Sequence, residues 1–281
     1  MSPTTIPGNL ILRNTYVAPP LLVYYPGAAA AYSLRNLTEN NISVVRVRRD
    51  NDDAEDDFTA TEVSDGTLAA WVGAGNNGFV RTWYDQSGNA RHAEQATTAS
   101  QPQIVATGSL LTENGKASLS FNGTSNYLTA AAFSVQTTDI SLVSVFKFNA
   151  LTGFQTFISF GGFIIGSGFL FQRPDSDTYR YATSGVFKDY GSNLNTNQTL
   201  LELYDKSNGA TEVFRNTVLT GQNSQSTAIN GSNVFEIGRR ADTSAQYTNM
   251  NAQEFIFYPS DQSANRAAIE SNINAHYSIY P

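Results

Sequence analysis

The chain has 281 residues, of which 41% are hydrophobic, so it can bury a large core in a single domain. Its formal net charge of −7 argues against nucleic-acid binding, which needs a basic surface, and no apolar run approaches the roughly 18 residues of a membrane span. Cysteine is absent and only two histidines are present, which excludes disulfides, thiolate ligands and the usual structural zinc sites. We therefore expect no cofactor and no metal, and a cytosolic site of folding fits the lack of cysteine.

Residues 1–27 are predicted to form an extended arm that precedes the folded domain. Proline fixes φ and removes a backbone donor, so a cluster of prolines favours extended chain. Five of the nine prolines lie here: Pro3, Pro7, Pro19, Pro20 and Pro26. The arm also carries apolar residues that need burial, such as Leu21 and Leu22. Two interpretations remain open, in which the arm packs on its own domain or docks into a partner.

Three short helices are expected in the remaining chain. The first covers about residues 28–37, which include four alanines. The second covers residues 67–72, with Ser64 or Asp65 as its N-cap. The third begins after Ser260 or Asp261 and runs to about residue 277, because Ile269, Ile273 and His276 or Tyr277 recur at helical spacing.

The rest of the chain has the pattern of β-strands. Residues 140–148 are apolar at nearly every position, which predicts a strand buried on both faces. Further alternating segments lie at residues 201–204 and 252–257. Asn-Gly pairs favour tight hairpins, and five of them begin at Asn77, Asn114, Asn122, Asn208 and Asn230. Short strands broken by such turns, without a linker, predict one sandwich or barrel domain over residues 28–281.

One stretch carries a recognisable motif. It starts at Ala31-Tyr32-Ser33-Leu34-Arg35, continues through Val45 to Arg49, and reaches Thr82-Trp83-Tyr84-Asp85-Gln86-Ser87-Gly88-Asn89, followed by His92, Gln95-Ala96 and Gln101-Pro102. This stretch resembles the catalytic domain of arabinofuranosidase B-type α-L-arabinofuranosidases, and more closely the phage and bacterial surface proteins that share that module. Residues 114–128 and 274–280 resemble laminin G-like and concanavalin A-like domains. The resemblance implies an all-β, concanavalin A-like antiparallel β-sandwich (a jelly roll).

The resemblance does not extend to the catalytic groups. Retaining glycosidases need two carboxyl groups that flank the scissile bond. The resembling enzymes carry a glutamate nucleophile on a middle strand, but this chain has no glutamate between Glu113 and Glu202, and residues 179–190 offer only Asp189. Asp242, four residues after Ile237-Gly238, is a loose match to the second acid, and the paired cysteines of the enzymes are absent. We therefore predict no catalytic residue and no glycosidase activity.

Candidate ligand-binding residues fall into two groups. Asp85, Gln86, Asn89 and His92 belong to the motif, although such side chains also hold tight turns, and the structural interpretation is favoured. Tyr179, Tyr181, Asp242 and Tyr247 are candidate sugar contacts, because sugar rings stack on aromatic rings while carboxylates and amides hold their hydroxyls. For these residues, too, the structural interpretation is favoured, as ordinary solvent-facing strand and loop residues. The acidic run from Asp50 to Asp57 lacks the spacing of a calcium loop, so a solvated surface run that neighbouring arginines neutralise is favoured.

Three functions are compatible with these features. The first is a non-catalytic virion protein of a phage tail, fibre or head decoration, or a surface protein, that binds a glycan or cell-surface polysaccharide. Its arm would contact other virion proteins, it could form a homo-oligomer, and it would bind neither nucleic acid nor membrane. The second is an arabinofuranosidase-like hydrolase with rearranged acids. The third is a purely structural decoration protein without a ligand.

Overall fold

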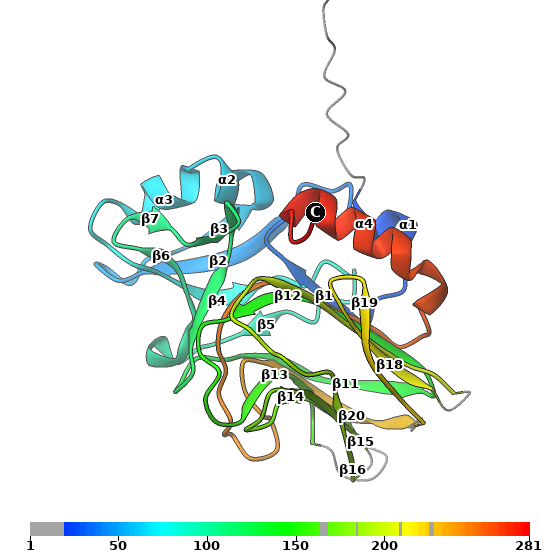
Figure 1. Ribbon diagram of the computed structural model, residues 1–281. Helices are drawn as coiled ribbons and strands as arrows, with labels where there is room; N and C mark the ends of the chain where they lie inside the picture. Colours follow the sequence, from blue (N-terminus) through cyan, green and yellow to red (C-terminus); the bar gives the residue numbers. More distant parts are fainter. Residues whose placement is uncertain (1–19, 163–167, 184, 208–209, 225–227) are drawn as a thin grey trace, which may run out of the picture.

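The computed structural model describes residues 20–281 apart from 163–167, 184, 208–209 and 225–227 (Figure 1). Every strand pairing among these residues is antiparallel, and the strands form two packed layers with a few short helices outside them. The predicted antiparallel β-sandwich is therefore confirmed.

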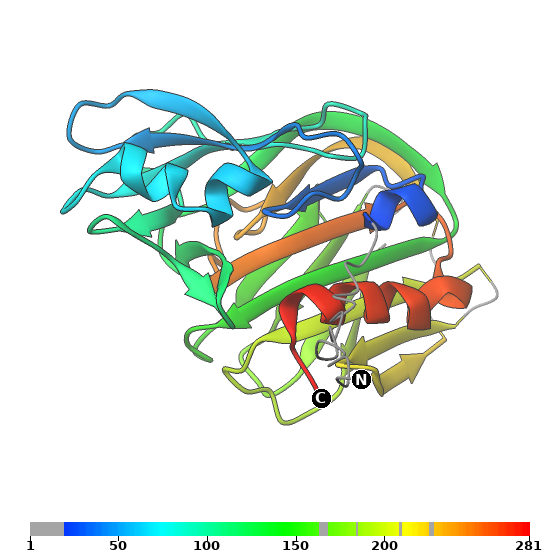
Figure 2. The ribbon, with the colours of Figure 1, turned by 90° about the horizontal axis from the view of Figure 1, so that it is seen from above.

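The first layer is built around β21 (Asn249–Tyr258). On one side β21 pairs with β12 (Ile140–Phe148), and on the other side β1 (Ala30–Ser33) and β10 (Leu119–Asn122) share its edge. Beyond β12 the layer continues through β17 (Thr199–Asp205), β18 (Thr211–Arg215) and β19 (Val218–Asn223). Figure 2 looks down on this layer, with β1, β21 and β12 side by side.

The second layer is built around β11 (Leu128–Thr137) and β20 (Ile229–Ile237), which pair over nearly their whole length. Beyond β20 it continues through β13 (Gln155–Phe160), β14 (Phe169–Arg173), β15 (Tyr179–Thr183) and β16 (Val186–Tyr190). The short β5 (Ala93–Glu94) pairs with the other edge of β11. At the far ends of the two layers β19 lies close to β16. The approach is tight at Gly221 of β19, where an added Cβ atom would lie 3.1 Å from the Cα of Tyr190 on β16.

A smaller N-terminal sheet joins the two layers. It consists of β2 (Ser43–Arg49), β3 (Glu55–Thr59), β4 (Gly78–Trp83), β6 (Gln103–Ala106) and β7 (Ser109–Leu110). One end of β4 pairs with β5, which pairs with the second layer, and the other end pairs with β6, which pairs with β10 of the first layer. A separate hairpin, β8 (Thr112–Glu113) and β9 (Lys116–Ala117), follows.

The acidic run lies in the β2–β3 hairpin, where arginines neutralise it. Arg46 pairs with Asp57, Arg48 with Asp53 and Arg49 with Asp52, each at 2.7 Å. No group of three or more metal-ligating side chains occurs among the residues that the structure describes. The local neutralisation predicted from the sequence is confirmed.

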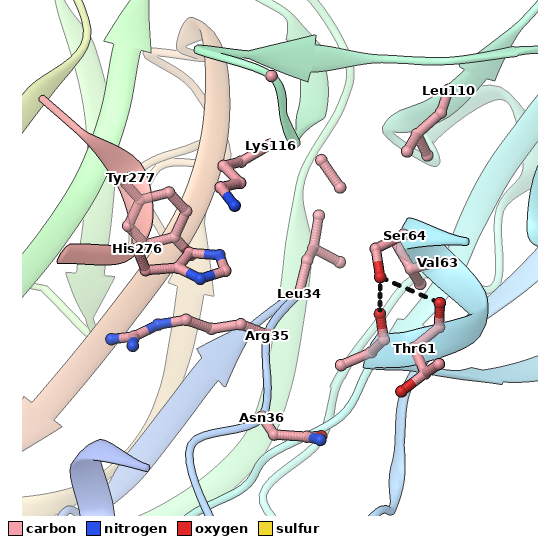
Figure 3. A pocket seen from close by; sticks show the side chains of 13 residues that line it. Leu34, Arg35, Asn36, Thr61, Val63, Ser64, Leu110, Lys116, His276 and Tyr277 are labelled. Atoms are coloured by element: carbon pink, nitrogen blue, oxygen red, sulfur yellow. Dashed lines mark hydrogen bonds between the residues drawn. The ribbon is translucent and has the colours of Figure 1, made fainter. Parts of the chain in front are cut away.

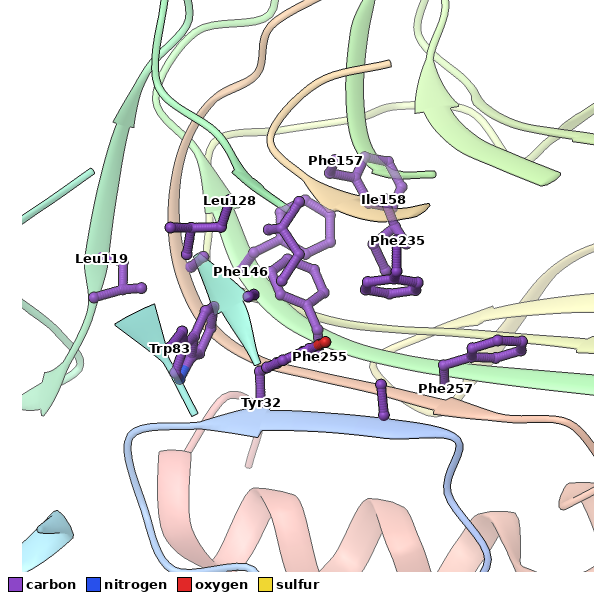
Figure 4. Close-up of a cluster of buried hydrophobic side chains, with 14 of the residues drawn as sticks. Tyr32, Trp83, Leu119, Leu128, Phe146, Phe157, Ile158, Phe235, Phe255 and Phe257 are labelled. Carbon is purple, nitrogen blue, oxygen red and sulfur yellow. The ribbon is translucent and has the colours of Figure 1, made fainter. Parts of the chain in front are cut away.

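Aromatic rings fill the space between the two layers (Figure 4). Phe146 of β12 stacks on Phe157 of β13 at 4.8 Å between ring centroids, and Phe257 of β21 stacks on Phe235 of β20 at 6.0 Å. The ring centroid of Tyr32 lies 5.9 Å from that of Trp83 on β4, so the same core extends beneath the N-terminal sheet. Offset ring pairs of this kind add to the stabilisation from burial alone.

The outer face of the first layer is apolar as well, and two helices cover it. These are α4 (Arg266–Tyr277), with the 3₁₀ turn η2 (Ser263–Asn265) before it, and α1 (Leu21–Tyr24). Figure 2 shows both helices lying across this layer, where Ile269 and Ile273 pack with Val143, Val145 and Ile256. This second core explains why β12 is buried on both faces, as predicted.

Several predicted elements need correction. Residues 28–37 do not form a helix, because Ala30–Ser33 pairs with β21 as a strand. The arm is not extended throughout, since residues 21–24 form the helix α1 with Leu21 and Leu22 on its buried side, whereas residues 1–19 lie outside the described residues. Leu21 and Leu22, which were predicted as part of the arm, pack on the outer face of the first layer. The helix at residues 67–72 (α3) is confirmed, with Gly66 as its N-cap, but α2 (Ala60–Ser64) and the 3₁₀ turn η1 (Thr98–Ser100) were not predicted.

The Asn-Gly pairs have different roles. Asn114 and Gly115 both have positive φ and close the two-residue β8–β9 hairpin as predicted. The prediction is wrong for Asn230, which lies inside β20, and for Asn77, whose glycine begins β4. Asn122 ends β10 and starts a longer turn, and the pair at Asn208 includes residues that the structure does not describe.

No helix within the described residues has both the length and the apolar character needed to cross a membrane.

We predict that Ile273→Ala lowers the thermal unfolding midpoint clearly. Ile273 is fully buried between α4 and the first layer, and such a truncation costs about 2–5 kcal/mol because it also leaves a cavity. Differential scanning calorimetry measures the change, with Ser271→Ala on the exposed side of α4 as the control. Equal midpoints for the two variants would show that α4 contributes little to the folded domain.

Candidate functional site

The loop that contains Asp85 forms hydrogen bonds with backbone groups within the loop and with β1. The Asp85 carboxylate accepts hydrogen bonds from the backbone N–H of Ala31 at 2.8 Å, of Ser87 at 2.9 Å and of Arg91 at 3.0 Å. Asp85 is 5% exposed. Both of its oxygens are therefore occupied by the fold, in the manner of Asp side chains in tight turns.

Gln86 and Asn89 connect the same loop to the segment around β1. Gln86 accepts a hydrogen bond from the N–H of Leu37 at 2.8 Å and donates to the carbonyls of Ser33 and Arg35, both at 3.0 Å. Asn89 donates to the carbonyl of Ala28 at 3.0 Å. These four partner groups all belong to residues 28–37. The structural interpretation of the motif thus accounts for Asp85, Gln86 and Asn89 without a ligand.

Tyr179 and Tyr181 are not surface rings. They are 3% and 0% exposed, on the inner face of β15. Tyr181 donates a hydrogen bond to Asp205 at 3.1 Å, and burial raises the pKa of Tyr179 to about 12. The prediction that these tyrosines offer rings to a sugar is wrong, because strand alternation turns both into the aromatic core.

Tyr247 lies in an open pocket of about 560 Å³, here called the Tyr247 pocket. Three turns form it: the one after β10, the one before β13 and the one before β21. Phe154 is 45% exposed on one wall, and Tyr247 forms another. The Tyr247 ring lies 6.3 Å from the ring of Tyr127, and the guanidinium of Arg239 covers the Tyr127 ring at 3.4 Å.

The polar groups of the Tyr247 pocket are of two kinds. Gln155 is used by the fold, because it donates to the carbonyl of Ala150 at 2.7 Å and accepts from the N–H of Asn249 at 2.9 Å. In contrast, the side chains of Thr124, Thr152 and Asn249 line the pocket and make no hydrogen bond within the described part of the chain. The pocket thus combines two aromatic walls with hydroxyl and amide groups that have no hydrogen-bond partner in the described chain.

Asn89 and His92 lie elsewhere, at a second pocket of about 530 Å³. Its walls include Thr129 and Phe133 of β11, and it shares no residue with the Tyr247 pocket. His92 accepts a hydrogen bond from the N–H of Asp85 at 3.2 Å, and its ring packs edge-on against that of Tyr84 at 4.9 Å. The candidate residues therefore do not form one site.

The two carboxylates considered for catalysis are both paired with arginines. Asp189 on β16 binds Arg180 of the neighbouring strand through two hydrogen bonds, at 2.6 and 2.9 Å. Asp242 binds Arg240 in the same two-point manner, at 2.5 and 2.8 Å. None of five pockets formed by the described residues is lined by two carboxylates. These pockets show no acid pair of the kind that glycoside hydrolysis requires.

Glu202 and Glu270 do form a close pair, but it is buried beneath α4. Burial raises the pKa of Glu202 well above its ordinary range, and the neighbouring Glu270 raises it further. Tyr204 donates to Glu202 at 2.8 Å, and Arg266 pairs with Glu270 at 2.5 Å. Glu270 lines a shallow pocket on α4, but Glu202 is fully buried and lines none of the five pockets, so the two carboxyls do not face a common cavity.

No family model matches the chain, and no curated protein matches it. Solved structures are similar to it in fold. One is a mutant GH54 α-L-arabinofuranosidase soaked with 4-nitrophenyl α-L-arabinofuranoside, with a TM-score of 0.71, 12% identity, and 92% of this chain and 65% of that chain covered. Another is an arabinofuranosidase complexed with arabinofuranosyl-α-1,2-xylobiose, with a TM-score of 0.67, 16% identity and the same coverage.

The binding domain of Paraclostridial Mosquitocidal Protein 1 is also similar, with a TM-score of 0.52, 11% identity, and 69% of this chain and 49% of that chain covered. The chain spans less than two thirds of the length of the arabinofuranosidase structures. The chain has the β-sandwich fold of the GH54 arabinofuranosidases. At these identities the likeness shows the fold alone, because one sandwich supports many functions.

Sequence reasoning selected Tyr247 and the nearby Asn249 but missed the residues that the other two turns contribute to the pocket. Phe154 and Thr152 lie more than 90 positions from Tyr247 in the chain, and Thr124 lies in a third turn. Each is an ordinary turn residue by itself. Only the pairing of β10, β12 and β21 brings the three turns to the same end of the sandwich.

We predict that the wild type loses stability as the pH rises above the ordinary titration range of a glutamate, about pH 4 to 5, and that Glu202→Gln reduces this loss. A carboxyl whose folded-state pKa is raised stabilises the protein fully below its unfolded pKa, and this contribution is lost as the pH rises towards the folded pKa. Thermal unfolding over a series of pH values from this range upwards measures the slope, with exposed Glu39→Gln as the control. Identical slopes for the wild type and Glu202→Gln would contradict the buried, protonated state of Glu202.

Proposed function

We propose that the protein is a non-catalytic carbohydrate-binding β-sandwich and that the Tyr247 pocket holds a sugar residue. The observation that supports this proposal is that the pocket contains aromatic rings together with polar side chains that have no hydrogen-bond partner in the described chain. Tyr247 and Phe154 offer ring faces, while Thr124, Thr152 and Asn249 offer polar groups with no protein partner in the described chain. A neutral sugar presents both C–H faces and hydroxyls, so it matches both kinds of group.

The location of the pocket supports the same proposal. Its side chains stand on turns, and these turns are fixed by the strands of a rigid sandwich. Gly123 has a positive φ, and a Cβ there would lie 2.8 Å from Asn249, so the turn after β10 packs closely against the start of β21. A preorganised wall of this kind lowers the entropy cost of binding.

The alternative function is arabinofuranoside hydrolysis, which the shared GH54 fold favours. Against it, Asp189 and Asp242 are each held by an arginine, and the Tyr247 pocket has no carboxylate among its described lining residues. Each of these two carboxylates accepts two hydrogen bonds from its arginine within the fold. The non-catalytic interpretation is therefore the one we propose.

We predict no release of arabinose from aryl α-L-arabinofuranoside or from arabinan. The wild-type protein and Asp242→Asn are compared at equal concentration over hours, with a chromogenic aglycone and with reducing-sugar detection. If the wild-type protein released arabinose and Asp242→Asn did not, the hydrolase alternative would replace our proposal.

We predict that Tyr247→Ala weakens glycan binding by about tenfold. Loss of a central aromatic anchor in an interface commonly costs more than about 1 kcal/mol, and about 1.4 kcal/mol corresponds to tenfold in affinity. A glycan array identifies the ligand, and titration calorimetry compares Tyr247→Ala with Tyr24→Ala, which truncates an exposed ring on α1. Equal affinities in the two variants would show that the sugar binds elsewhere.

The proposal includes display of the sandwich on a virion or cell surface, with residues 1–19 as the attachment segment. The sequence resemblance to phage and bacterial surface proteins supports this part. The proposed attachment segment ends at residue 19, because Leu21 and Leu22 are buried in the second core. Contact with other virion proteins and formation of a homo-oligomer stay predictions.

A further inference from the structure

A cavity of about 420 Å³ lies apart from the candidate residues considered above, and it is here called the His276 pocket (Figure 3). Five segments meet around it: the end of α4, the residues after β1, the helix α2, the strand β7 and the β8–β9 hairpin. It shares no residue with the Tyr247 pocket.

The charges around the His276 pocket leave the ammonium of Lys116 uncompensated. The Arg35 guanidinium is neutralised by Glu254, with hydrogen bonds of 2.7 and 3.0 Å. Burial and the positive charges of Arg35 and Lys116 lower the pKa of His276 to about 4, so this imidazole is neutral at pH 7. No aspartate or glutamate is found among the described residues that line the cavity. The pocket therefore carries a net charge of about +1, which lies on Lys116.

Lys116 differs from two other lysines that have carboxylate neighbours. Lys147 pairs with Glu113 at 3.1 Å, and Lys206 pairs with Glu212 at 2.7 Å. Glu113 is the direct cross-strand neighbour of Lys116, but it is taken by Lys147 and by Asn251, which donates to it at 2.6 Å. Within the described chain the Lys116 ammonium forms no ion pair or hydrogen bond, and Figure 3 shows it directed towards His276 and Tyr277.

The remaining walls indicate what an anion in this pocket would carry with it. The Oδ1 atom of Asn36 is buried and has no hydrogen-bond partner among the described residues, so it can accept a hydrogen bond from a ligand. Leu34, Val63 and Leu110 make the apolar side of the pocket. A small organic molecule with one negative group and a compact body matches this lining.

We infer that the His276 pocket binds a small organic carboxylate, with the carboxylate on the Lys116 ammonium and the body of the molecule between Asn36 and the apolar wall. The carboxylate gives this ammonium the partner that the described chain does not supply, and a charge-assisted hydrogen bond of this type is about twice as strong as a neutral one. Sugar acids and apolar acids share this chemistry. The site is independent of sugar binding in the Tyr247 pocket.

The two histidines provide a direct readout. The imidazole resonances of His276 and His92 are distinguished by the variant His92→Gln, since the chain has no third histidine. An anion bound beside Lys116 offsets the positive charges that lower the pKa of His276, so its pKa should rise on binding. His92 lies in a different pocket and serves as an internal control.

The experiment titrates the full chain with four probes and follows both histidines by NMR. Glucuronate and cyclohexanecarboxylate carry the negative group on a sugar and on an apolar ring, while methyl glucoside and cyclohexylmethanol are the neutral counterparts. We expect saturable shifts of His276 with at least one acid and with neither neutral probe. The acid that binds more tightly identifies the body that the pocket prefers.

Variants of two lysines decide whether Lys116 holds the anion. We expect Lys116→Met to weaken binding by about tenfold or more, while Lys188→Met, on the β15–β16 hairpin, leaves it unchanged. In the free protein Lys116→Met should also raise the pKa of His276, which confirms that the variant is folded and that the two side chains face each other. Unshifted His276 with both acids, or equal binding by wild type and Lys116→Met, would overturn the inference.

Discussion

A buried ion pair between Arg35 and Glu254 is the contact on which the arrangement of the outer helix and the first layer depends. Arg35 follows β1, Glu254 lies in the middle of β21, and Tyr277 at the end of α4 donates to the same carboxylate at 3.1 Å. Burial by itself would raise the pKa of Glu254, but Arg35 holds it below its ordinary value. Removal of one partner from such a pair costs about 3–5 kcal/mol, because the other charge stays buried.

The same pair shapes the two surfaces to which we assign ligands. It fixes the residues after β1 and the end of α4, which form two sides of the His276 pocket. Glu254 also lies on β21, the central strand of the first layer, and the start of β21 contributes to the Tyr247 pocket. One pocket is cationic and the other is neutral with exposed rings, so the sandwich presents two chemically different concave sites on one rigid frame.

The Asp85 loop shows how a motif can serve the fold while resembling a site. Its carboxylate and amides satisfy backbone groups of residues 28–37. Such groups would be costly to bury unpaired, so the loop needs these residue types for structural reasons. The loop thus serves the β-sandwich fold, whereas function depends on the residues of a site.

The sequence by itself determined the class of fold and its most regular elements. The doubly apolar segment at residues 140–148 and the stripe of Ile269 and Ile273 identified a buried strand and the helix that covers it, because burial repeats at fixed periods along the chain. Only the tertiary structure decided that residues 30–33 form a strand, that Tyr179 and Tyr181 face the core, and that Tyr247 shares a pocket with Phe154. These outcomes depend on pairing between segments far apart in the chain, which local periodicity does not encode.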